Sequence, residues 1–437
     1  MGAVFSNIVV ALFVLGVIIV IHELGHFLVA KYFRIRIETF SVGFGPRLVG
    51  YRYGDTDYRI SAFPLGGYVK MSGENPGDDV TGDPHEFLSK PKWQRFLVAA
   101  AGPAMNIVLA VVLLAGLYMY GTEVPEFLQN EARVGIVESD SPAAAAGVVS
   151  GDLILEFDGD ELPNWQQVET DIIISPGRAI PLILEREGRV IETTVTPEKR
   201  GVSEMGYSGM GPHVRVVVAA VEAGLPAEQA GILTDDEIIA VGETDLRLAG
   251  SSIQELIQQY PEDVFPVTVL RGEQTLNFEV EPIVRDGQRM IGIQIPIPMV
   301  MIKLGFVGAI QRSIQTNTTN GLLIFEVLGR LVKRETSMRA LDGPIGIVRV
   351  SGQAFQAGFT TLISLMALIS LNLGILNLLP IPILDGGVML LLLVEGVIRQ
   401  DLSLAIKERI VQVGFVFLLL VTAFVLYNDI VKAVSRE

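Results

Sequence analysis

Long apolar runs separated by polar blocks dominate the pattern of this chain. Residues 8–30, 96–120 and 410–427 form three nearly uninterrupted apolar stretches. A fourth apolar stretch, residues 360–398, is too long for one ordinary span and is broken in the middle by two prolines. Each stretch is long enough to cross a bilayer as a helix. The pattern therefore predicts a polytopic α-helical membrane protein with four spans.

Two of the intervening segments show weaker patterns. Residues 35–72 alternate in part and are broken by Gly and Pro, with a turn expected at 53–56, so they predict a membrane-associated β region. Its apolar, glycine-rich pieces around Gly43, Gly45 and Gly67 either dip into the membrane, where protein shields their backbone, or form a surface loop. Residues 304–332 are amphipathic and are interrupted by a polar run at 315–320. They predict a helix or a helix pair on the membrane surface.

Residues 121–300 form a polar block that contains an internal repeat. SPAAAAGVVSGDLILEFDGDEL aligns with LPAEQAGILTDDEIIAVGETDL, and the prolines, glycines and aspartates of the two copies lie 84 positions apart. An arginine follows in each copy, at Arg186 and Arg271. A repeat of this size is a whole small domain. Each copy predicts a strand, a short Ala-rich helix, a strand, a helix and paired strands, an order that resembles circularly permuted bacterial PDZ domains.

These patterns divide the chain into eight segments. They are a first transmembrane helix (1–34), a cytoplasmic or reentrant β region (35–95), a second transmembrane helix (96–120), two tandem PDZ-like domains (121–212 and 213–300), an amphipathic membrane-surface segment (301–359), a third, broken transmembrane helix (360–398) and a fourth transmembrane helix (408–428).

Composition and charge add an orientation. The 437 residues are 50% hydrophobic and have a mean hydropathy of +0.46, which favours membrane spans. The formal net charge of −16 does not suit a nucleic-acid binder. Basic clusters follow the first span and precede the second, and the positive-inside rule then places residues 31–95 in the cytoplasm. The repeats and both termini are expected on the other side of the membrane.

The first apolar run contains candidate catalytic and metal-binding residues, in the motif HELGH. His22 and His26 are four residues apart, so they share one face of a helix and can bind one Zn²⁺. Glu23 beside them can move a proton during attack on a peptide carbonyl. Ionisable side chains at membrane depth are costly and mark a functional site by default.

The broken third span supplies the remaining candidates. Asp385, the only carboxylate between Leu362 and Val394, is a third zinc ligand in this interpretation, and water takes the fourth position of an open catalytic site. Asn377 either hydrogen-bonds the substrate or its developing oxyanion, or caps the broken helix. Asn106, inside the second span, either faces the site or makes an ordinary hydrogen bond between helices.

HELGH in a first span, NLLPIPILDGG in a later span and a PDZ-like pair between them together resemble the site-2 protease family of intramembrane zinc metalloproteases. The resemblance implies that His22, His26 and Asp385 bind zinc and that Glu23 is catalytic. It also assigns substrate handling to Asn377, Pro380, Pro382 and the β region with Gly43, Gly45 and Gly67, which is expected to present substrate as an added strand. Val388 departs from the family, which often has His at this position.

The resemblance further implies a multi-pass protein of a bacterial inner membrane, with the PDZ-like domains and both termini in the periplasm. The expected substrates are single-pass membrane proteins, such as an anti-sigma factor, and signal-peptide remnants, in regulated intramembrane proteolysis. The alternative is a membrane-tethered PDZ scaffold with a non-catalytic zinc site. A structural zinc site is normally closed by four protein ligands, whereas this sequence offers three and retains Glu23.

Overall fold

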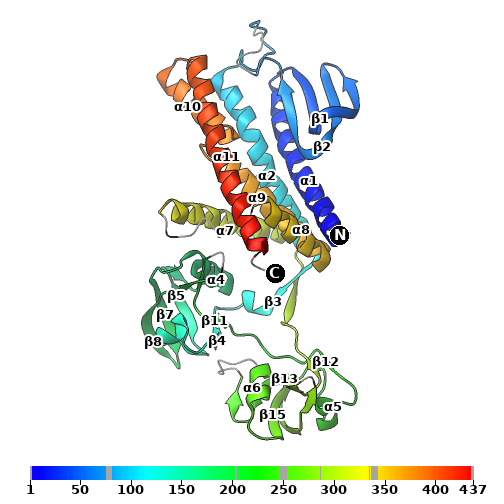
Figure 1. Ribbon diagram of the computed structural model, residues 1–437, viewed down its shortest axis with the longest axis vertical. Coiled ribbons are helices and arrows are strands. Elements are labelled where there is room, and N and C mark those ends of the chain that lie inside the picture. Colours follow the sequence, from blue (N-terminus) through cyan, green and yellow to red (C-terminus); the bar gives the residue numbers. More distant parts are fainter. Residues whose placement is uncertain are drawn as a thin grey trace. The chain divides into compact units, whose positions relative to one another are not determined.

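A computed structural model describes residues 2–74, 81–201, 204–246, 253–285, 287–333, 335 and 343–434 (Figure 1). The chain folds into two compact units. The first comprises Met1–Thr122, Lys303–Glu326 and Leu341–Glu437, and the second comprises Glu123–Ile302 and Val327–Ala340.

Long helices build the first unit. They are α1 (Gly2–Tyr32), α2 (Lys92–Tyr120), most of α7 (Phe306–Val332), α8 (Pro344–Ala357), α9 (Phe359–Leu378), α10 (Asp385–Ile398) and α11 (Leu404–Val434). Within the described part of the chain, four helices are long and apolar enough to cross a membrane by length and composition: Phe5–Tyr32, Lys92–Tyr120, Phe359–Leu378 and Ala405–Lys432. The four spans expected from the apolar pattern are thus present as helices.

Helix α2 lies at the centre of this unit, because α1, α9 and α10 all pack against it (Figure 1). The α1–α2 approach depends on Gly25, where an added Cβ would lie 2.7 Å from the carbonyl carbon of Ala101. Small residues permit such close contact between helices in membranes. The central position of α2 matters for the metal centre, because one of its faces lies against the histidines of α1.

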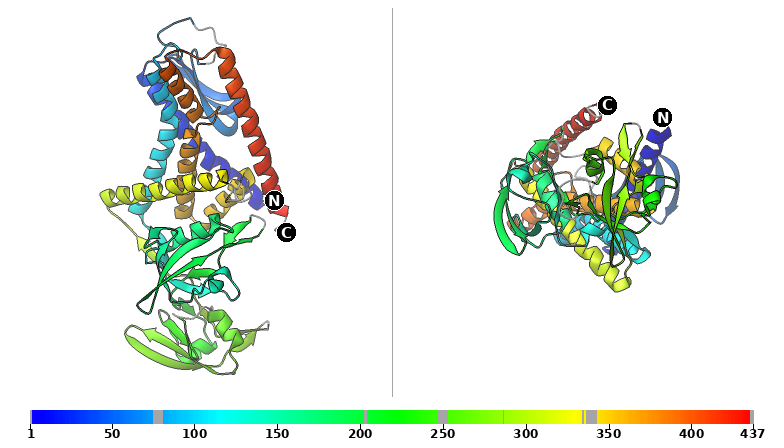
Figure 2. Two further views of the ribbon diagram at one scale, coloured as in Figure 1. Left: turned by 90° about the vertical axis from the view of Figure 1, so that its left-hand side faces the viewer. Right: turned by 90° about the horizontal axis from the view of Figure 1, so that it is seen from below.

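Helix α11 is attached to the unit at few points. Only 6% of its apolar window is buried, and Figure 2 shows it running along the outside of the helices of its own unit. Gly414 packs against Pro382 in the break between α9 and α10. Near the other end of α11, the Asp429 carboxylate accepts hydrogen bonds from the backbone N–H groups of Gly343, Ile345 and Gly346 at the start of α8. Such a carboxylate satisfies backbone donors that the helix itself leaves unpaired.

The β region is a sheet of two long, bent strands, β1 (Ile37–Tyr53) and β2 (Thr56–Met71), joined at the expected turn. The first half of β1 pairs on one side with residues 57–60 and on the other with residues 67–71. The last part of β2 is therefore an edge strand. It lies against α1 (Figure 1), and Val69 and Met71 contribute to a core shared with Ala30.

Helix α7 is one continuous helix, so the polar run at 315–320 does not interrupt it. The reason is that the polar side chains bond to their own helix: Thr316 Oγ1 donates to the Arg312 carbonyl and Asn317 Nδ2 to the Ser313 carbonyl. Ser313 Oγ in turn donates to the Val111 carbonyl of α2. These bonds satisfy the polar side chains inside the helix, and the Ser313 bond joins the helix to α2.

Two lobes with the same order of elements form most of the second unit. Both contain a four-stranded antiparallel sheet, with strand order β6-β5-β7-β8 in the first lobe and β14-β13-β15-β16 in the second. The first lobe and its approaches contain β3 (Thr122–Pro125), η1 (Glu126–Leu128), β4 (Val134–Val137), α3 (Pro142–Ala145), β5 (Leu153–Phe157), β6 (Asp160–Glu161), α4 (Trp165–Ile174), β7 (Ile180–Arg186), β8 (Arg189–Val195), β9 (Glu198–Arg200), β10 (Met205–Tyr207) and β11 (Met210–Pro212). The second contains β12 (Ala220–Val221), α5 (Pro226–Ala230), β13 (Glu237–Val241), β14 (Thr244–Asp245), α6 (Ile253–Gln259), β15 (Phe265–Arg271), β16 (Gln274–Val280), β17 (Ile283–Arg285), β18 (Gln288–Met290) and β19 (Ile293–Gln294), and β20 (Met299–Ile302) follows it.

The repeated Gly, Asp and Arg of the sequence form the same buried ion pair in each lobe. In the first lobe, Arg186 binds both oxygens of the fully buried Asp152 at 2.7 and 2.8 Å and also donates to the Gly147 carbonyl. Arg271, Asp236 and Gly231 repeat this arrangement in the second lobe with the same distances. The repeat is therefore a structural motif, in which a two-pronged guanidinium neutralises a buried carboxylate.

Candidate metal centre

The metal centre begins on α1, which carries the HELGH residues in mid-helix. The rise and turn of the helix bring His22 and His26 onto one face, and both are buried, with exposures of 7% and 8%. Their Nε2 atoms are 3.2 Å apart. Two imidazole nitrogens at this separation converge on one point beside the helix.

Asp385 reaches the same point from a region 359 positions later in the chain. It is the first residue of α10, directly after the break that contains Pro380 and Pro382. Its two oxygens lie 3.1 Å from His22 Nε2 and 3.5 Å from His26 Nε2. The proline break ends α9 at Leu378 and lets α10 start with this carboxylate turned to α1.

The three side chains have the spacing that zinc requires. Ligand atoms about 2.1 Å from a tetrahedral ion lie roughly 3.4 Å from one another. The shortest separations between the side chains are close to this value: 3.2 Å between the two Nε2 atoms, 3.1 Å from His22 Nε2 to Asp385 Oδ2 and 3.5 Å from His26 Nε2 to Asp385 Oδ1. Among the described residues, this is one of two clusters of histidines and carboxylates able to hold a metal ion, and it alone contains histidine. Three protein donors leave one tetrahedral position for a water or a substrate.

The ring of His26 is oriented by the backbone of α2. Its Nδ1 lies 2.8 Å from the Val98 carbonyl oxygen, an atom that can only accept a hydrogen bond. Nδ1 therefore carries the proton, and the lone pair of Nε2 is free to bind a metal.

Glu23 and the edge strand of the β region lie together beside the histidines. An added Cβ at Gly67 would lie 2.8 Å from the Ser41 carbonyl oxygen, which is too close, and 3.4 Å from Glu23 Cγ, an ordinary contact, so the strand backbone passes directly beside Glu23. The Glu23 carboxylate also accepts a hydrogen bond from the Val69 backbone. The structure thus brings the candidate proton carrier and the edge of the sheet to one place.

The remaining candidates occupy different positions. Asn377 Nδ2 lies 3.5 Å from His22 Nε2, so this amide is at the centre, near the end of α9. Pro382 packs against Gly414 of α11, while Pro380 is exposed. Gly43 and Gly45 adopt φ values of 91° and 89°, which other residues rarely adopt, and Gly43 lies against the Phe63 carbonyl in the bend of the sheet.

Two further residues of α2 touch the centre. Asn106 is fully buried, with Nδ2 3.1 Å from His22 Nδ1, so it faces the site. At Gly102, an added Cβ would lie 2.8 Å from His22 Nε2 and closer still to His26 Nε2. The small residues at 99–104 permit close helix packing, but no periodicity in the sequence says that this packing is against the histidines.

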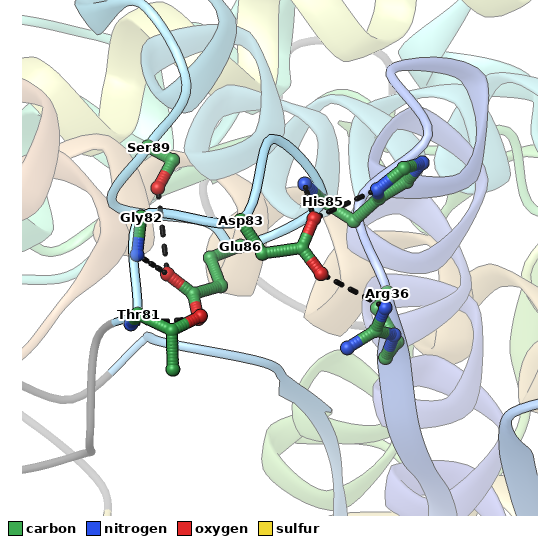
Figure 3. Close-up of polar contacts among 7 residues, drawn as sticks. All are labelled: Arg36, Thr81, Gly82, Asp83, His85, Glu86 and Ser89. Carbon is green, nitrogen blue, oxygen red and sulfur yellow. Dashed lines mark hydrogen bonds and ion pairs between the residues drawn. The ribbon is translucent and has the colours of Figure 1, made fainter.

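The two other histidines lie away from the centre. The His85 ring donates from Nδ1 to one oxygen of Asp83, and Arg36 donates to the other oxygen at 3.0 Å (Figure 3). The pKa of Asp83 is lowered to about 2 by the backbone N–H of His85, then by its ring and by Arg36. Glu86 beside it accepts hydrogen bonds from Thr81, Gly82 and Ser89 (Figure 3). These contacts fold the loop that follows β2 and include no second metal ligand set.

His213 lines a cavity of about 470 Å³ in the second unit, together with Trp165 and Arg133. Its backbone N–H donates to the Arg133 carbonyl. The cavity belongs to the first lobe and its C-terminal strand, and it lies in a different unit from the three candidate ligands.

Comparison with known proteins gives consistent results along nearly the whole chain. The model of peptidase family M50 matches residues 10–421. A Treponema pallidum protein named "Putative zinc metalloprotease" is 30% identical over 445 residues, covering 97% of this chain and 98% of the relative. The regulator of sigma E protease of Haemophilus influenzae is 30% identical, covering 96% and 97%. The regulator of sigma-E protease RseP of Escherichia coli is 30% identical over 441 residues, covering 95% and 96%.

Proposed function

Because this chain belongs to peptidase family M50, the site-2 proteases, and is a zinc metalloprotease with membrane-spanning helices, we propose that it hydrolyses peptide bonds within transmembrane segments of single-pass membrane proteins. His22, His26 and Asp385 hold the zinc, and Glu23 carries protons. The observation that supports this most directly is the convergence of these three side chains, whose nearest donor atoms are 3.1–3.5 Å apart, from helices far apart in sequence.

Zinc at this position supplies Lewis-acid activation of water and of the scissile carbonyl. The chain's own residues do the rest. Glu23, which lies beside the ligands and against the strand edge, accepts the proton of the attacking water and delivers it to the leaving amine. Asn377, 3.5 Å from His22 Nε2, donates from its amide to the carbonyl oxygen as negative charge develops there.

The edge strand of the β region presents the substrate in this proposal. A transmembrane helix must unwind before its backbone can be cleaved, and an extended segment exposes N–H and C=O groups that need partners. The last part of β2 is an edge, and its Gly67 and Val69 lie at Glu23. Strand addition would satisfy the unwound segment and hold its carbonyl beside the catalytic carboxylate. Pro380 and Pro382 shape the opposite wall, formed by the break before Asp385.

The two lobes of the second unit act as PDZ-like domains that gate access. Both repeat the element order expected of permuted PDZ domains and each has its own apolar core, while the candidate ligand set lies outside them. We assign them to the periplasmic side of a bacterial inner membrane, where they exclude proteins whose outer domain is still large. Substrates would then be membrane proteins already shortened, of the anti-sigma factor type, and signal-peptide remnants. Reporter fusions after Tyr68 and after Val195 should report opposite compartments.

The scaffold alternative fits the centre less well. A purely structural zinc site gains nothing from an open fourth position or from a carboxylate held beside it by a strand backbone. In this centre, three side chains form the donor set. The neighbouring Glu23 carboxylate accepts a hydrogen bond from the Val69 backbone. A scaffold would also place no requirement on the edge strand that meets Glu23.

The substitution Glu23→Gln separates zinc binding from proton transfer. The proton carrier is lost while the ligands remain, so the purified protein should retain about one zinc per chain. Cleavage of a model transmembrane peptide in detergent should fall by about 10²–10⁴-fold, the usual contribution of a general base. His22→Ala is the control and should lose both zinc and cleavage. Wild-type cleavage by Glu23→Gln would overturn the mechanism, and zinc retention by His22→Ala would overturn the ligand set.

A further inference from the structure

One face of α2 meets both histidines of the metal centre. Val98, Gly102 and Asn106 are spaced four residues apart, so they lie one above another on the helix. The Val98 carbonyl lies at His26 Nδ1, Gly102 lies against both Nε2 atoms, and the Asn106 amide lies at His22 Nδ1. Val98 and Asn106 therefore meet the outer sides of the two rings, where metal-binding histidines usually have a hydrogen-bond acceptor, and Gly102 meets the side on which the ligand atoms converge.

The contact at His22 is incompatible with metal binding if the amide is oriented as placed. A His22 ring that binds metal through Nε2 carries its proton on Nδ1, which then needs an acceptor. The atom 3.1 Å from Nδ1 is Asn106 Nδ2, which is a donor. The acceptor of the same amide, Oδ1, is buried and has no hydrogen-bond partner within the described part of the chain.

Exchanging the two ends of the amide replaces this donor–donor contact with a hydrogen bond. The oxygen and nitrogen of an asparagine side chain have nearly the same shape, so their assignment follows from the hydrogen-bond network. With Oδ1 toward His22, the ring donates Nδ1–H to Asn106 and directs the Nε2 lone pair into the space that it shares with His26 Nε2 (3.2 Å away) and Asp385 (3.1 Å away), where zinc would lie. The opposite tautomer would place a proton between the ligands.

We propose that Asn106 is a positioning residue that presents its carbonyl oxygen to His22 Nδ1–H and so fixes the tautomer and ring orientation required for zinc. The two histidines then have matched supports from one helix face: a backbone carbonyl for His26 and a side-chain carbonyl for His22. Gly102 between them leaves the space in which the ligand atoms converge. This inference rests on the proposed zinc site and adds a residue that does not itself bind the ion.

The test compares zinc affinity of full-length variants by chelator competition in detergent. Asn106→Leu keeps the side-chain size and removes the acceptor, so zinc affinity should fall by about 10–100-fold. Asn106→Asp restores an acceptor oxygen and should bind zinc at least within a few fold of wild type. Asn317→Leu is the matched control, because Asn317 is also a buried amide of this unit but bonds Ser313, and it should leave zinc affinity unchanged.

A spectroscopic readout distinguishes positioning from a general loss of packing. The chain has only four histidines, so ¹⁵N-histidine labelling gives a simple spectrum. Zinc-loaded wild type should show hydrogen-bonded Nδ1–H signals from His22 and His26. Asn106→Leu should lose the His22 signal and keep that of His26, and Asn106→Asp should keep both. If Asn106→Leu does not fold, Asn106→Ala removes the same acceptor.

Unchanged zinc affinity in the folded acceptor-less variant, or an Asn106→Asp protein as weak as Asn106→Leu, would overturn the positioning role while leaving the zinc site intact. Failure of the wild-type protein to bind zinc, or retention of zinc by His22→Ala, would instead overturn the proposed function. The two failures therefore have different signatures.

Discussion

The repeated aspartates of the two lobes and Asp385 of the helical unit lie in different surroundings. In the lobes, Asp152 and Asp236 are fully buried, and each is bound by both arms of an arginine from the same sheet. In the helical unit, the side chain of Asp385 is 22% exposed and faces two histidines, with no arginine or lysine among its recorded ion-pair partners in the described residues. A local cation completes the first kind of site, whereas we propose that a zinc ion completes the second.

This difference separates stability from chemistry. The Asp–Arg pairs occur twice with the same geometry, next to the same glycine carbonyl, and leave no open position around the carboxylate. Among the described residues the Asp385 cluster occurs once; it brings together helices from both ends of the chain and has a strand edge beside Glu23, the proposed proton carrier. A neutralised, closed pair holds a fold together, while an open, converging donor set can bind and activate a ligand.

The largest expected effect comes from removing the Asp385 carboxylate, which faces the two histidines. Asp385→Ala should abolish zinc binding and peptide cleavage, because two histidines alone do not hold catalytic zinc. The helices should remain folded, since the substitution removes a charge from an apolar unit. Metal analysis, cleavage and circular dichroism measure the three outcomes. Zinc retained at one per chain would show that Asp385 is not a ligand.

Deleting the two lobes, which contain the Asp–Arg pairs, tests whether catalysis is confined to the helical unit. Removal of residues 125–300 with a short linker should leave zinc binding and cleavage of a short transmembrane peptide intact. Uncut substrate with its outer domain attached should become cleavable, because the steric barrier is gone. If the lobes instead capture a trimmed C-terminus, the deletion will give no such gain and will slow cleavage of the trimmed form. A folded, zinc-loaded deletion protein that cleaves no peptide would refute gating altogether.

Removing the arginine of one Asp–Arg pair should lower the stability of its lobe and leave peptide cleavage unchanged. Arg271→Met leaves the buried Asp236 without its main partner, so thermal unfolding of the second lobe should shift downward by roughly 10 °C. Arg186→Met should do the same in the first lobe. Arg285→Met, at an exposed position of the second lobe, is the matched control. Cleavage of a short peptide should be unchanged in all three variants. A loss of peptide cleavage while the lobes remain folded would show that the Asp–Arg pairs also affect catalysis.

The smallest effect is the acid response of the second lobe. Burial opposes ionisation of Asp236, but Arg271 and the Leu233 N–H outweigh it, and the pKa of Asp236 lies below its usual value. A lowered folded-state pKa contributes stability that is complete above the unfolded-state pKa of about 3.9 and is lost as pH falls through the lower folded-state pKa. Unfolding of the lobe by urea should therefore be insensitive to this group at pH 5–7 and become easier below about pH 4. Asp236→Asn should be less stable at neutral pH and show a flatter acid response; an unchanged slope would contradict the assignment.

Several features were determined by the sequence alone. Apolar runs long enough to cross a bilayer specify helices wherever they occur, so the four spans follow from local composition. Two prolines after Asn377 specify a break in the third of them, because proline removes the hydrogen bonds of a continuous helix. The spacing of His22 and His26 specifies one helix face. The repeated Gly, Asp and Arg marked equivalent positions in two lobes, although their shared ion pair appears only in three dimensions.

Only the tertiary structure decided what meets these local features. The distance from His22 to Asp385 depends on how α1 and α10 pack on α2, and no periodicity encodes that packing. The polar run of α7 remained helical because its side chains bond within the helix and to α2, a competition that composition does not resolve. Asn106 could be placed on α2 from the sequence, but its partner could not. Contacts between residues far apart in the chain depend on the free energy of packing the whole unit, so they are settled only when all the helices are in place.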